Sequence, residues 1–254
     1  MTDAGRTLAV LTYHSIATAP GPTSIAPATF RMQMEALAAR GIVTLDVAGF
    51  LRWHNGEAPR NRCVLITFDD AFADFAEVAH PVLRAHGFSA LVFAPTGALG
   101  GCETWPGAPT PPRALLDWPT VRALAGEGVE FGGHGVAHAD LTRLSPDARR
   151  REIDGCAQAL SARLGMRPRA FAAPYGRVDP AVCADIARIW DVAFGTRFAR
   201  ATVGADRFDV PRIEMHYFRA ARRWAAFLDG HQGYLNTRRV LRAVRMASAA
   251  LVRP

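Results

Sequence analysis

Two adjacent carboxylates end an apolar stretch of the sequence. Residues 64–68 (Val-Leu-Ile-Thr-Phe) are hydrophobic and partly β-branched, and Asp69 and Asp70 follow directly. Such a run is typical of a buried parallel strand, and α/β folds keep their active sites at the C-terminal ends of such strands. Neighbouring carboxylates repel each other unless a cation or a shared proton offsets the repulsion. The pair therefore indicates a cation site or, more simply, a cap on the following helix.

Two histidines four residues apart, His134 and His138, follow a short predicted strand at residues 129–131. If the intervening backbone turns helically, this spacing brings both imidazoles to one side. Alone, the pair says little, because a histidine is often a hydrogen-bonded polar residue. Together with one aspartate of the 69–70 pair it supplies two nitrogens and one oxygen, the ligand set of a catalytic zinc or similar divalent metal. The other carboxylate would be free to accept a proton from water.

A third cluster, residues 171–176 (Phe-Ala-Ala-Pro-Tyr-Gly), also follows a predicted strand end. A Pro-Tyr-Gly turn can direct a backbone N–H at a developing oxyanion, while the ring of Tyr175 forms a pocket wall. As a bare tripeptide it is more often only a turn.

Strand and helix patterns alternate about seven times along the chain. Strands are predicted at residues 8–13, 42–45, 64–68, 89–94, 129–131, 170–173, 192–196 and 208–215. This alternation predicts an α/β fold, an irregular (β/α) barrel of about seven parallel strands. A Gly/Pro-rich loop at residues 95–112 carries Trp105, and loops of this length in compact domains are usually functional or disordered.

The composition limits the classes of partner. The chain has 254 residues, half of them hydrophobic, which is enough for one large α/β domain. Its net charge is +7, and every basic residue is an arginine. A basic surface favours anionic partners such as lipid headgroups or acidic glycans. Nucleic acid is not expected, because the arginines are scattered among acids and no nucleic-acid motif accompanies them.

The cysteines and the N-terminus bear on the cellular compartment. Four cysteines lie far apart with no C-x-x-C pair, and we expect them to be buried thiols of a reducing compartment: Cys63, Cys102, Cys156 and Cys183. The apolar run near the N-terminus is too short and too polar for a signal peptide, and no stretch is long enough to span a bilayer. We therefore expect a cytoplasmic protein, with membrane association left open.

From about Arg219 the pattern changes, so the sequence divides into a catalytic domain at residues 1–218 and a basic helical extension at residues 219–254. An apolar stripe lies opposite much of the charge of this extension: Val240, Leu241, Val244, Ala247 and Leu251. The stripe predicts a helix packed on the barrel with a solvated basic face. The alternative is an interfacial helix that contacts an anionic membrane.

With these clusters in this order, the sequence resembles the polysaccharide deacetylases, the NodB-homology or carbohydrate esterase family 4 group, over roughly residues 8–217. Residues 67–70 (Thr-Phe-Asp-Asp) resemble the family's T-F-D-D motif, in which the first aspartate is the general base and the second a metal ligand. His134 and His138 resemble the two ligands of its H-S/T-x-x-H motif. Residues 173–176 resemble the third motif, whose tyrosine N–H helps to stabilise the oxyanion.

The resemblance implies a metal-dependent N-deacetylase that hydrolyses the acetamido group of an N-acetylhexosamine glycan or glycan precursor. Asp69 would be the base, Tyr175 the oxyanion donor, and Asp70, His134 and His138 the metal ligands. Zn²⁺ is the expected metal, with Co²⁺ and Ni²⁺ as alternatives.

Residues 11–14 (Leu-Thr-Tyr-His) and the helix after them are similar to the poly-N-acetylglucosamine branch of the family, in which a histidine of the N-terminal strand supplies the general acid. This similarity makes His14 the expected acid, with a buried structural histidine as the alternative role. His216, in a faint echo of the family's L-x-H motif, is the alternative acid. Further residues expected to contact substrate are Trp105, Pro174 and Arg212.

Three positions depart from the family's pattern. Ala71 stands where glycine is usual, Gly135 replaces the Ser/Thr that supports the histidine loop, and Ala172 stands where many members carry an arginine that orients the base. Arg212 could reach the site from the last strand. The departures leave the metal ligands intact but affect the residues that hold them. Two alternative functions follow: a deacylase or deformylase of another lipid- or nucleotide-linked amido sugar, and a catalytically silent glycan-binding module.

Overall fold

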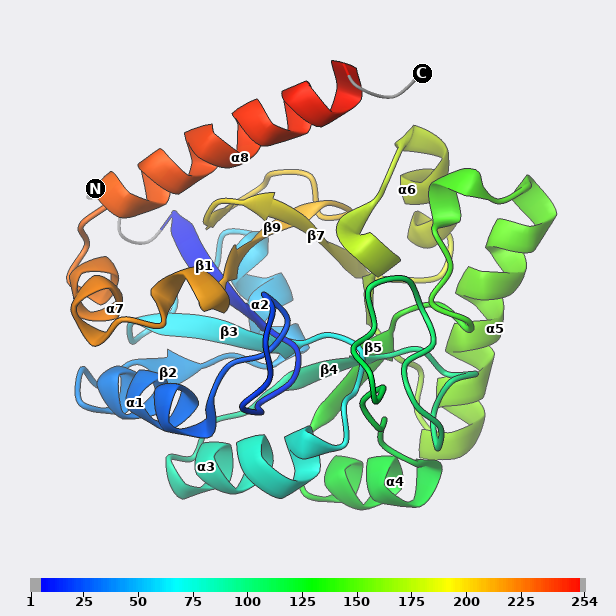
Figure 1. The fold of residues 1–254 in the computed structure, drawn as a ribbon, viewed down its shortest axis with the longest axis horizontal. Helices are drawn as coiled ribbons and strands as arrows, with labels where there is room; N and C mark the ends of the chain where they lie inside the picture. The colour runs from blue at the N-terminus through cyan, green and yellow to red at the C-terminus, as the bar shows by residue number, and fades with distance from the viewer. Residues whose placement is uncertain (1–5, 252–254) are drawn as a thin grey trace.

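The computed structural model describes the backbone of residues 6–251 and the side chains of residues 6–242. Within this part, seven parallel strands close into a barrel (Figure 1). They are β1 (Thr7–Tyr13), β3 (Cys63–Phe68), β4 (Leu91–Ala94), β5 (Glu130–Gly133), β6 (Ala170–Ala172), β7 (Val192–Phe198) and β9 (Val210–Glu214). The barrel closes because β1 pairs with both β3 and β9. The predicted irregular barrel of about seven parallel strands is therefore confirmed.

Two short strands lie outside the barrel. β2 (Val43–Thr44) pairs with the first residues of β3, and β8 (Ala201–Thr202) pairs antiparallel with the start of β1. β8 was not predicted from the sequence, because a two-residue strand has no detectable alternation.

Helices surround the barrel (Figure 1). They are α1 (Pro27–Ala38), α2 (Val47–His54), α3 (His80–Ala85) after a π-helical turn at Phe75–Ala79, α4 (Trp118–Gly126), α5 (Pro146–Leu164), α6 (Pro180–Ala187), α7 (Ala221–Leu228) and α8 (Gly233–Leu251). Several begin at a side chain that accepts a hydrogen bond from an N–H of the first turn: Asp46, Asp117, Ser145 and Asp179.

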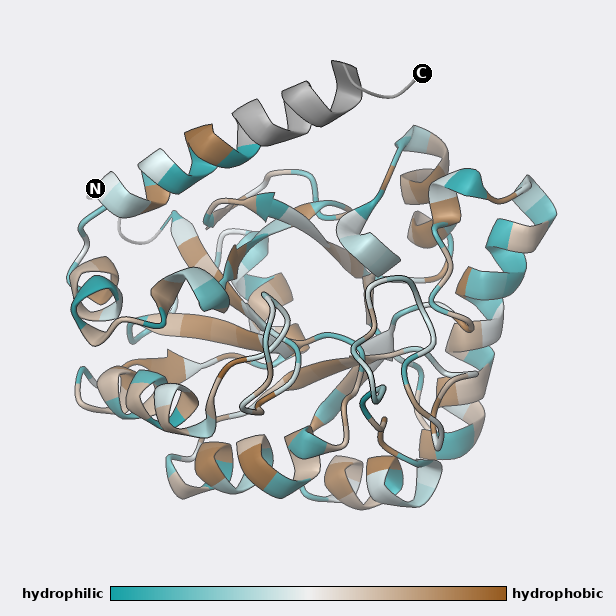
Figure 2. Ribbon diagram, viewed as in Figure 1, coloured by the Kyte–Doolittle hydropathy of each residue, from teal (hydrophilic) through white to brown (hydrophobic). Residues whose placement is uncertain are grey.

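The strand side chains alternate between two hydrophobic layers, since successive residues of a strand point to opposite faces. An inner cluster fills the barrel and includes Val10, Leu65, Phe93 and Phe194. Helix α2, behind the strands in Figure 1, joins this cluster through Phe50. An outer cluster lies between the strands and the remaining helices. Figure 2 accordingly shows the barrel strands mainly in the hydrophobic colour, whereas the outer helices are mixed.

At the C-terminal ends of the strands, the inward positions become polar. The inward series are Leu8, Val10 and Thr12 of β1 with His14 directly after it; Leu65 and Thr67 of β3 with Asp69 directly after it; and Val210, Arg212 and Glu214 of β9. The same alternation that fills the barrel with apolar side chains therefore brings polar groups from three strands to one end of it.

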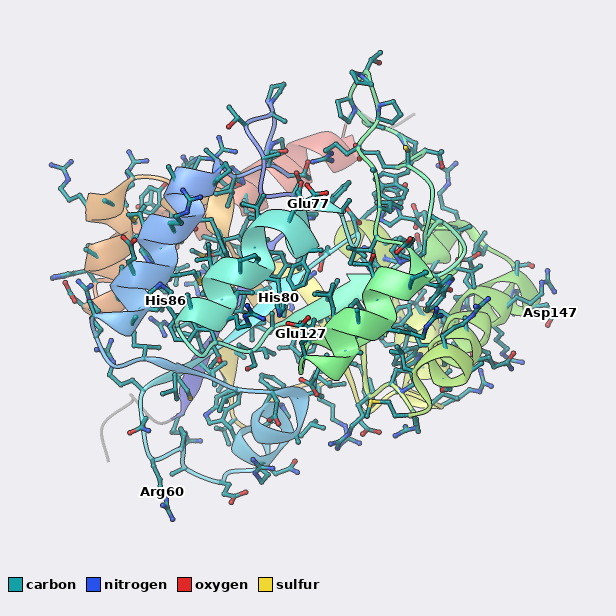
Figure 3. All side chains as sticks on the ribbon, turned by 90° about the horizontal axis from the view of Figure 1, so that it is seen from below. Arg60, Glu77, His80, His86, Glu127 and Asp147 are labelled. Carbon is teal, nitrogen blue, oxygen red and sulfur yellow. The ribbon has the colours of Figure 1, made fainter. Side chains whose placement is uncertain are left out.

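Ion pairs join neighbouring helices of the outer layer. Between α3 and α4, the carboxylate of Glu127 lies 3.9 Å from Nε2 of His80 and accepts a hydrogen bond of 3.2 Å from Arg84 (Figure 3). Between α5 and α6, Asp185 accepts hydrogen bonds of 2.7 and 3.1 Å from Arg149 and Arg150. These pairs connect neighbouring helices of the outer layer.

The C-terminal segment packs on the barrel, but not through the predicted stripe. Trp224 and Phe227 of α7 and Leu235 of α8 belong to the outer core cluster. Val240 and Leu241 are 59% and 51% exposed, so the predicted packing is wrong for these two residues. The side chains of the other predicted stripe residues lie outside the described part of the chain: Val244, Ala247 and Leu251. The division between residues 218 and 219 stays a prediction.

Arginines occupy the barrel-facing side of α8 instead. Arg238 lies 4.8 Å from the ring centroid of Tyr217 and donates a hydrogen bond to the hydroxyl of Tyr234. Arg242 donates a hydrogen bond to the carbonyl of Thr196 in β7. The long apolar stems of these arginines cover aromatic rings, and their guanidinium groups donate hydrogen bonds to oxygen atoms. Because these arginines cover the barrel surface, Val240 and Leu241 can face solvent.

The cysteine prediction is only partly confirmed. Cys156 is buried and Cys63 and Cys183 are partly buried, but Cys102 is exposed on the loop between β4 and α4. All four are free thiols. Among the described residues, none of the helices has the length and apolar character needed to cross a bilayer.

Glycine at position 132 is expected to be essential for close packing in β5. A Cβ atom there would lie 2.5 Å from the carbonyl oxygen of Ala170 and 2.7 Å from the ring of Phe93. We expect Gly132→Ala to lower the free energy of unfolding by about 1–3 kcal/mol, because the core cannot accommodate the added methyl group. The matched control is Gly126→Ala, where nothing lies within 4 Å of the added atom. Urea denaturation curves compare the two, and equal midpoints would contradict the prediction.

Candidate active site

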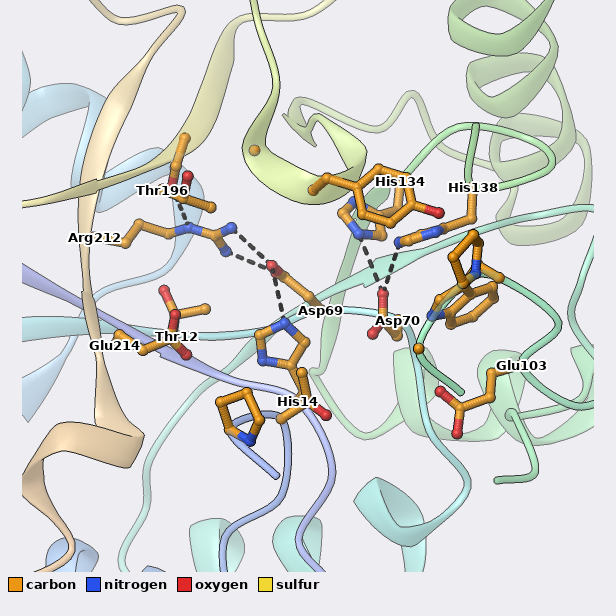
Figure 4. Close-up of a pocket in the computed structure, with 18 of the residues that line it drawn as sticks. Thr12, His14, Asp69, Asp70, Glu103, His134, His138, Thr196, Arg212 and Glu214 are labelled. Atoms are coloured by element: carbon orange, nitrogen blue, oxygen red, sulfur yellow. Dashed lines mark hydrogen bonds and ion pairs between the residues drawn. The ribbon is translucent and has the colours of Figure 1, made fainter. Parts of the chain in front are cut away.

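A cavity of about 330 Å³ opens at the polar end of the barrel. Its volume is at the lower end of the range for small-molecule sites, roughly 300–1,000 Å³. Eight of the nine predicted site residues line it: His14, Asp69, Asp70, Trp105, His134, His138, Tyr175 and Arg212 (Figure 4). The ninth, Pro174, is buried and is not part of the cavity wall. Substrate contact by Pro174 is therefore not supported by the geometry.

Asp69 is held by a bidentate ion pair with Arg212. Both carboxylate oxygens accept hydrogen bonds of 2.7 Å from the guanidinium, and the two side chains are only 6% and 2% exposed. Arg212 also donates to the carbonyl of Gly195, which fixes the guanidinium in the barrel. Burial alone would raise the pKa of Asp69, but the charge and hydrogen bonds of Arg212 outweigh burial and lower it. Asp69 is therefore an ionised carboxylate with a fixed orientation.

Asp70 faces the opposite way, toward the two histidines. The Nε2 atoms of His134 and His138 lie 3.3 and 3.1 Å from its Oδ1 atom. One ligand atom from each of the three residues can be chosen so that all lie within 4.8 Å of one another. The Nδ1 atom of His134 lies 2.7 Å from the carbonyl of Ala172, which can only accept, so in the neutral ring Nε2 carries the lone pair.

This donor set fits a divalent metal. All three side chains are nearly buried, and both imidazoles face the same carboxylate oxygen. In the neutral His134 ring the Nε2 lone pair would repel that oxygen unless a proton or a cation lay between them. Two nitrogens and one carboxylate beside a cavity match a catalytic site with open positions. Residues Asp70, His134 and His138 could therefore hold such an ion.

Electrostatic coupling within this group shifts all three pKa values. Burial opposes ionisation of Asp70, but hydrogen bonds from His134 and His138 outweigh it and hold the pKa of Asp70 well below its usual range. Burial lowers the pKa of His134, yet its bond to Asp70 prevails and the pKa is raised. For His138 burial prevails over the bond to Asp70, and the pKa is lowered.

Left-handed backbone conformations are concentrated at the site. The non-glycine residues with positive φ in the described chain are Asp70 (71°), Ala71 (55°), His138 (55°) and Tyr175 (60°). Such conformations cost about 1–3 kcal/mol each and persist where the surroundings enforce them. At residues 70 and 71 the chain turns sharply after β3, so Asp70 reaches the histidines while Asp69 stays with Arg212. The turn separates two adjacent carboxylates into different environments.

The backbone between the two histidines does not turn helically, yet both imidazoles face Asp70. Gly135 has φ 75° and His138 has φ 55°, and the segment between them is not helical. The loop folds back because the carboxylate of Glu152, on α5, accepts hydrogen bonds of 2.8 and 2.9 Å from the N–H groups of Val136 and Ala137. The role of Glu152 was not predicted from the sequence, because only the packing of α5 on β5 brings this residue to the loop.

Two aromatic rings flank His138. The ring of Trp105 stacks on it with centroids 4.1 Å apart, and the ring of Tyr175 meets it edge-on at 4.7 Å. Trp105 lies on the loop between β4 and α4. An ion pair that was not predicted from the sequence stabilises this loop. Buried Glu103 accepts hydrogen bonds of 2.6 and 2.8 Å from Arg113. No periodic pattern marks such a pair within an irregular loop.

The two candidate acids have different surroundings. His14 lines the cavity, with Nε2 at 3.9 Å from Asp69 Oδ2. Its strand end is held by Asp74, which accepts hydrogen bonds from the hydroxyl of Ser15 and the N–H of Ile16. His216 is not among the lining residues, and burial, followed by nearby arginines, lowers its pKa to about 4. At neutral pH the His216 ring is therefore uncharged and lacks the acidic proton of an imidazolium, which favours His14.

Comparison with known proteins gives consistent matches. Residues 56–190 match the family model for polysaccharide deacetylase. A curated Bacillus subtilis (strain 168) protein named for polysaccharide deacetylation, YxkH, is 27% identical over 147 residues, which is 58% of this chain and 48% of YxkH. The chain thus spans about half the length of this relative.

Two solved structures share the fold. The Streptococcus pyogenes deacetylase PplD, solved in complex with acetate, is 25% identical, with a TM-score of 0.72 over 82% of this chain and 91% of PplD. IcaB from Ammonifex degensii is 22% identical, with a TM-score of 0.72 over 87% of this chain and 97% of IcaB. Because the family model matches more than half of the sequence, the chain belongs to the polysaccharide deacetylase family.

Proposed function

We propose that the protein is a metal-dependent hydrolase that removes the acetyl group from an N-acetylhexosamine glycan or glycan precursor. The observation that carries this proposal is one cavity containing an ionised, oriented carboxylate, a separate group of three residues that could hold a metal ion, and a histidine beside the carboxylate. Family membership and the fold shared with PplD support the same reaction class.

A divalent ion held by Asp70, His134 and His138 would act as a Lewis acid and lower the pKa of water, and Zn²⁺ is the expected ion, with Co²⁺ and Ni²⁺ as alternatives. Asp69 is suited to accept the proton of the attacking water, because Arg212 keeps it ionised and fixed in orientation.

The remaining steps use the other cavity residues. Attack of water on the amide carbon develops negative charge on the carbonyl oxygen, to which the Tyr175 N–H would donate. Cleavage of the carbon–nitrogen bond then needs a proton for the leaving amine, and His14 lies at the cavity wall on the Asp69 side. The products are acetate and the free amino sugar. Trp105 offers a flat apolar ring against which a sugar can pack.

Two alternative functions can be distinguished from this proposal by experiment. A deacylase or deformylase of another lipid- or nucleotide-linked amido sugar would use the same residues, and comparing formate with acetate release across substrates separates the two. A silent glycan-binding module would need no metal, so metal analysis of the purified protein distinguishes it from an enzyme.

The two adjacent aspartates are expected to have separable roles. Asp70→Asn should lose most of the bound metal and all acetate release, because a metal ligand is weakened. Asp69→Asn should keep the metal and lose activity, because an amide cannot accept the proton. Elemental analysis after dialysis and an acetate assay on chitooligosaccharides measure both properties. Since the two substitutions are chemically identical and adjacent, each is the control for the other. Turnover by Asp69→Asn would refute its role as the base.

The general acid can be assigned by paired histidine variants. His14→Gln should lower kcat roughly 100- to 10,000-fold, the usual contribution of a general acid. His216→Gln, with a similar change of size and polarity outside the cavity, should leave kcat nearly unchanged. Steady-state acetate release measures both. The reverse order of the two effects would assign the acid to His216.

We also propose that the protein acts in the cytoplasm and contacts an anionic membrane through its C-terminal segment. The support is that Val240 and Leu241 project away from the barrel on α8, beside the exposed Arg239. Exposed apolar side chains next to arginines suit the boundary between anionic headgroups and acyl chains. Such contact would bring the cavity close to a glycan precursor attached to the membrane.

Loss of the exposed apolar pair should weaken this contact. We expect Val240→Ser/Leu241→Ser to lower partitioning onto phosphatidylglycerol vesicles about tenfold or more, because two side chains no longer leave water. Val43→Ser, an exposed valine of β2, is the control. Vesicle flotation measures bound protein, and phosphatidylcholine vesicles test the charge requirement. Equal flotation of the double variant and the unaltered protein would end this proposal.

A further inference from the structure

Helix α8 contributes a side chain to the candidate active site. Arg242 lines the cavity together with Thr196 of β7 and Glu214 of β9. Its NH2 group donates a hydrogen bond of 3.1 Å to the carbonyl of Thr196, and its guanidinium lies 5.7 Å from the ring centroid of Phe198. These contacts hold the guanidinium at the cavity wall.

Arg242 differs from the other arginines of this cavity in its bonding. Arg212 and Arg113 each make a bidentate ion pair, with Asp69 and Glu103. The carboxylate beside Arg242 is that of Glu214, but NH1 and Oε2 are 3.9 Å apart, too far for a hydrogen bond. A guanidinium has five N–H donors. Arg242 therefore keeps donors for a ligand in the cavity.

Glu214 is likewise unused by the proposed reaction. It is the inward residue after Arg212 on β9 and lies opposite Thr12 of β1 in the strand register. Its side chain is 20% exposed, and within the described part of the chain its carboxylate accepts no hydrogen bond. Glu214 thus supplies acceptors next to the donors of Arg242.

We propose that Arg242 and Glu214 form a subsite for a second, uncharged sugar unit, next to the unit that carries the reacting acetamido group. The pair places N–H donors beside carboxyl oxygens, a combination that suits a ligand with several hydroxyl groups. A sugar hydroxyl both donates and accepts, and two neighbouring hydroxyls can accept from Arg242 and donate to Glu214. Glu214 is two residues from Arg212, the partner of Asp69, so this subsite adjoins the reacting position.

This inference rests on the proposed function for its substrate class, and it adds a second sugar unit to the expected substrate. For a substrate of more than one sugar unit, the C-terminal segment is then part of the substrate-binding surface. A substrate restricted to one sugar would leave both side chains without a ligand.

The test compares chain lengths in matched variants. For the metal-loaded protein, the ratio of kcat/KM for chitotetraose to that for N-acetylglucosamine should fall roughly 3- to 10-fold in Arg242→Gln, as expected for lost hydrogen bonds to a neutral ligand. Glu214→Gln should change the ratio in the same direction. Arg239→Gln, an exposed arginine on the same helix, is the control and should keep the ratio of the unaltered protein. An unchanged ratio in Arg242→Gln would overturn the proposal.

Calorimetric titration of chitotetraose gives a second readout that needs no turnover. Weaker binding to Arg242→Gln than to Arg239→Gln supports the subsite, and equal binding overturns it. If the protein binds chitotetraose in this Arg242-dependent way but releases no acetate, the proposed reaction fails while the subsite stands. If acetate is released and neither the ratio nor the affinity changes, the subsite fails and the reaction stands.

Discussion

The pairing of Arg212 with Asp69 depends on closure of the barrel. The two residues are 143 positions apart in the sequence and come from β9 and the end of β3, which meet only because β1 pairs with both strands. Both side chains are buried, and the guanidinium neutralises a carboxylate that would otherwise be buried alone. Breaking such a pair leaves an uncompensated charge and typically costs about 3–5 kcal/mol, so the geometry of the site and the stability of the closed barrel are linked.

Each of the three departures from the family's pattern has a visible structural consequence. Ala71 adopts a left-handed conformation that glycine would adopt without strain. At Gly135 a side chain would approach the carboxylate of Glu152, which itself supports the histidine loop. Arg212 holds the base from β9, so no arginine is needed at Ala172, whose carbonyl instead orients His134.

The C-terminal segment carries charge in two different environments. Arg238 and Arg242 of α8 face the barrel, where Arg238 packs on an aromatic ring and Arg242 donates a hydrogen bond to a carbonyl group. Arg242 also lines the cavity. Arg239 and two apolar residues, Val240 and Leu241, face outward. One helix can therefore contribute to substrate binding on one side and to surface contact on the other.

The sequence by itself determined the seven barrel strands and the three residues of the candidate metal site. These features depend on local periodicity and on motifs of a few residues, which need no knowledge of strand order. Tertiary structure alone decided the features that join distant segments: the Arg212–Asp69 pair, Glu152 behind the histidine loop, the Glu103–Arg113 anchor and the side of α8 that faces the barrel. The backbone between His134 and His138 is not helical, because contacts with α5 determine that loop. Likewise, the apolar stripe of α8 could not reveal its orientation, since arginine stems can also cover a hydrophobic surface.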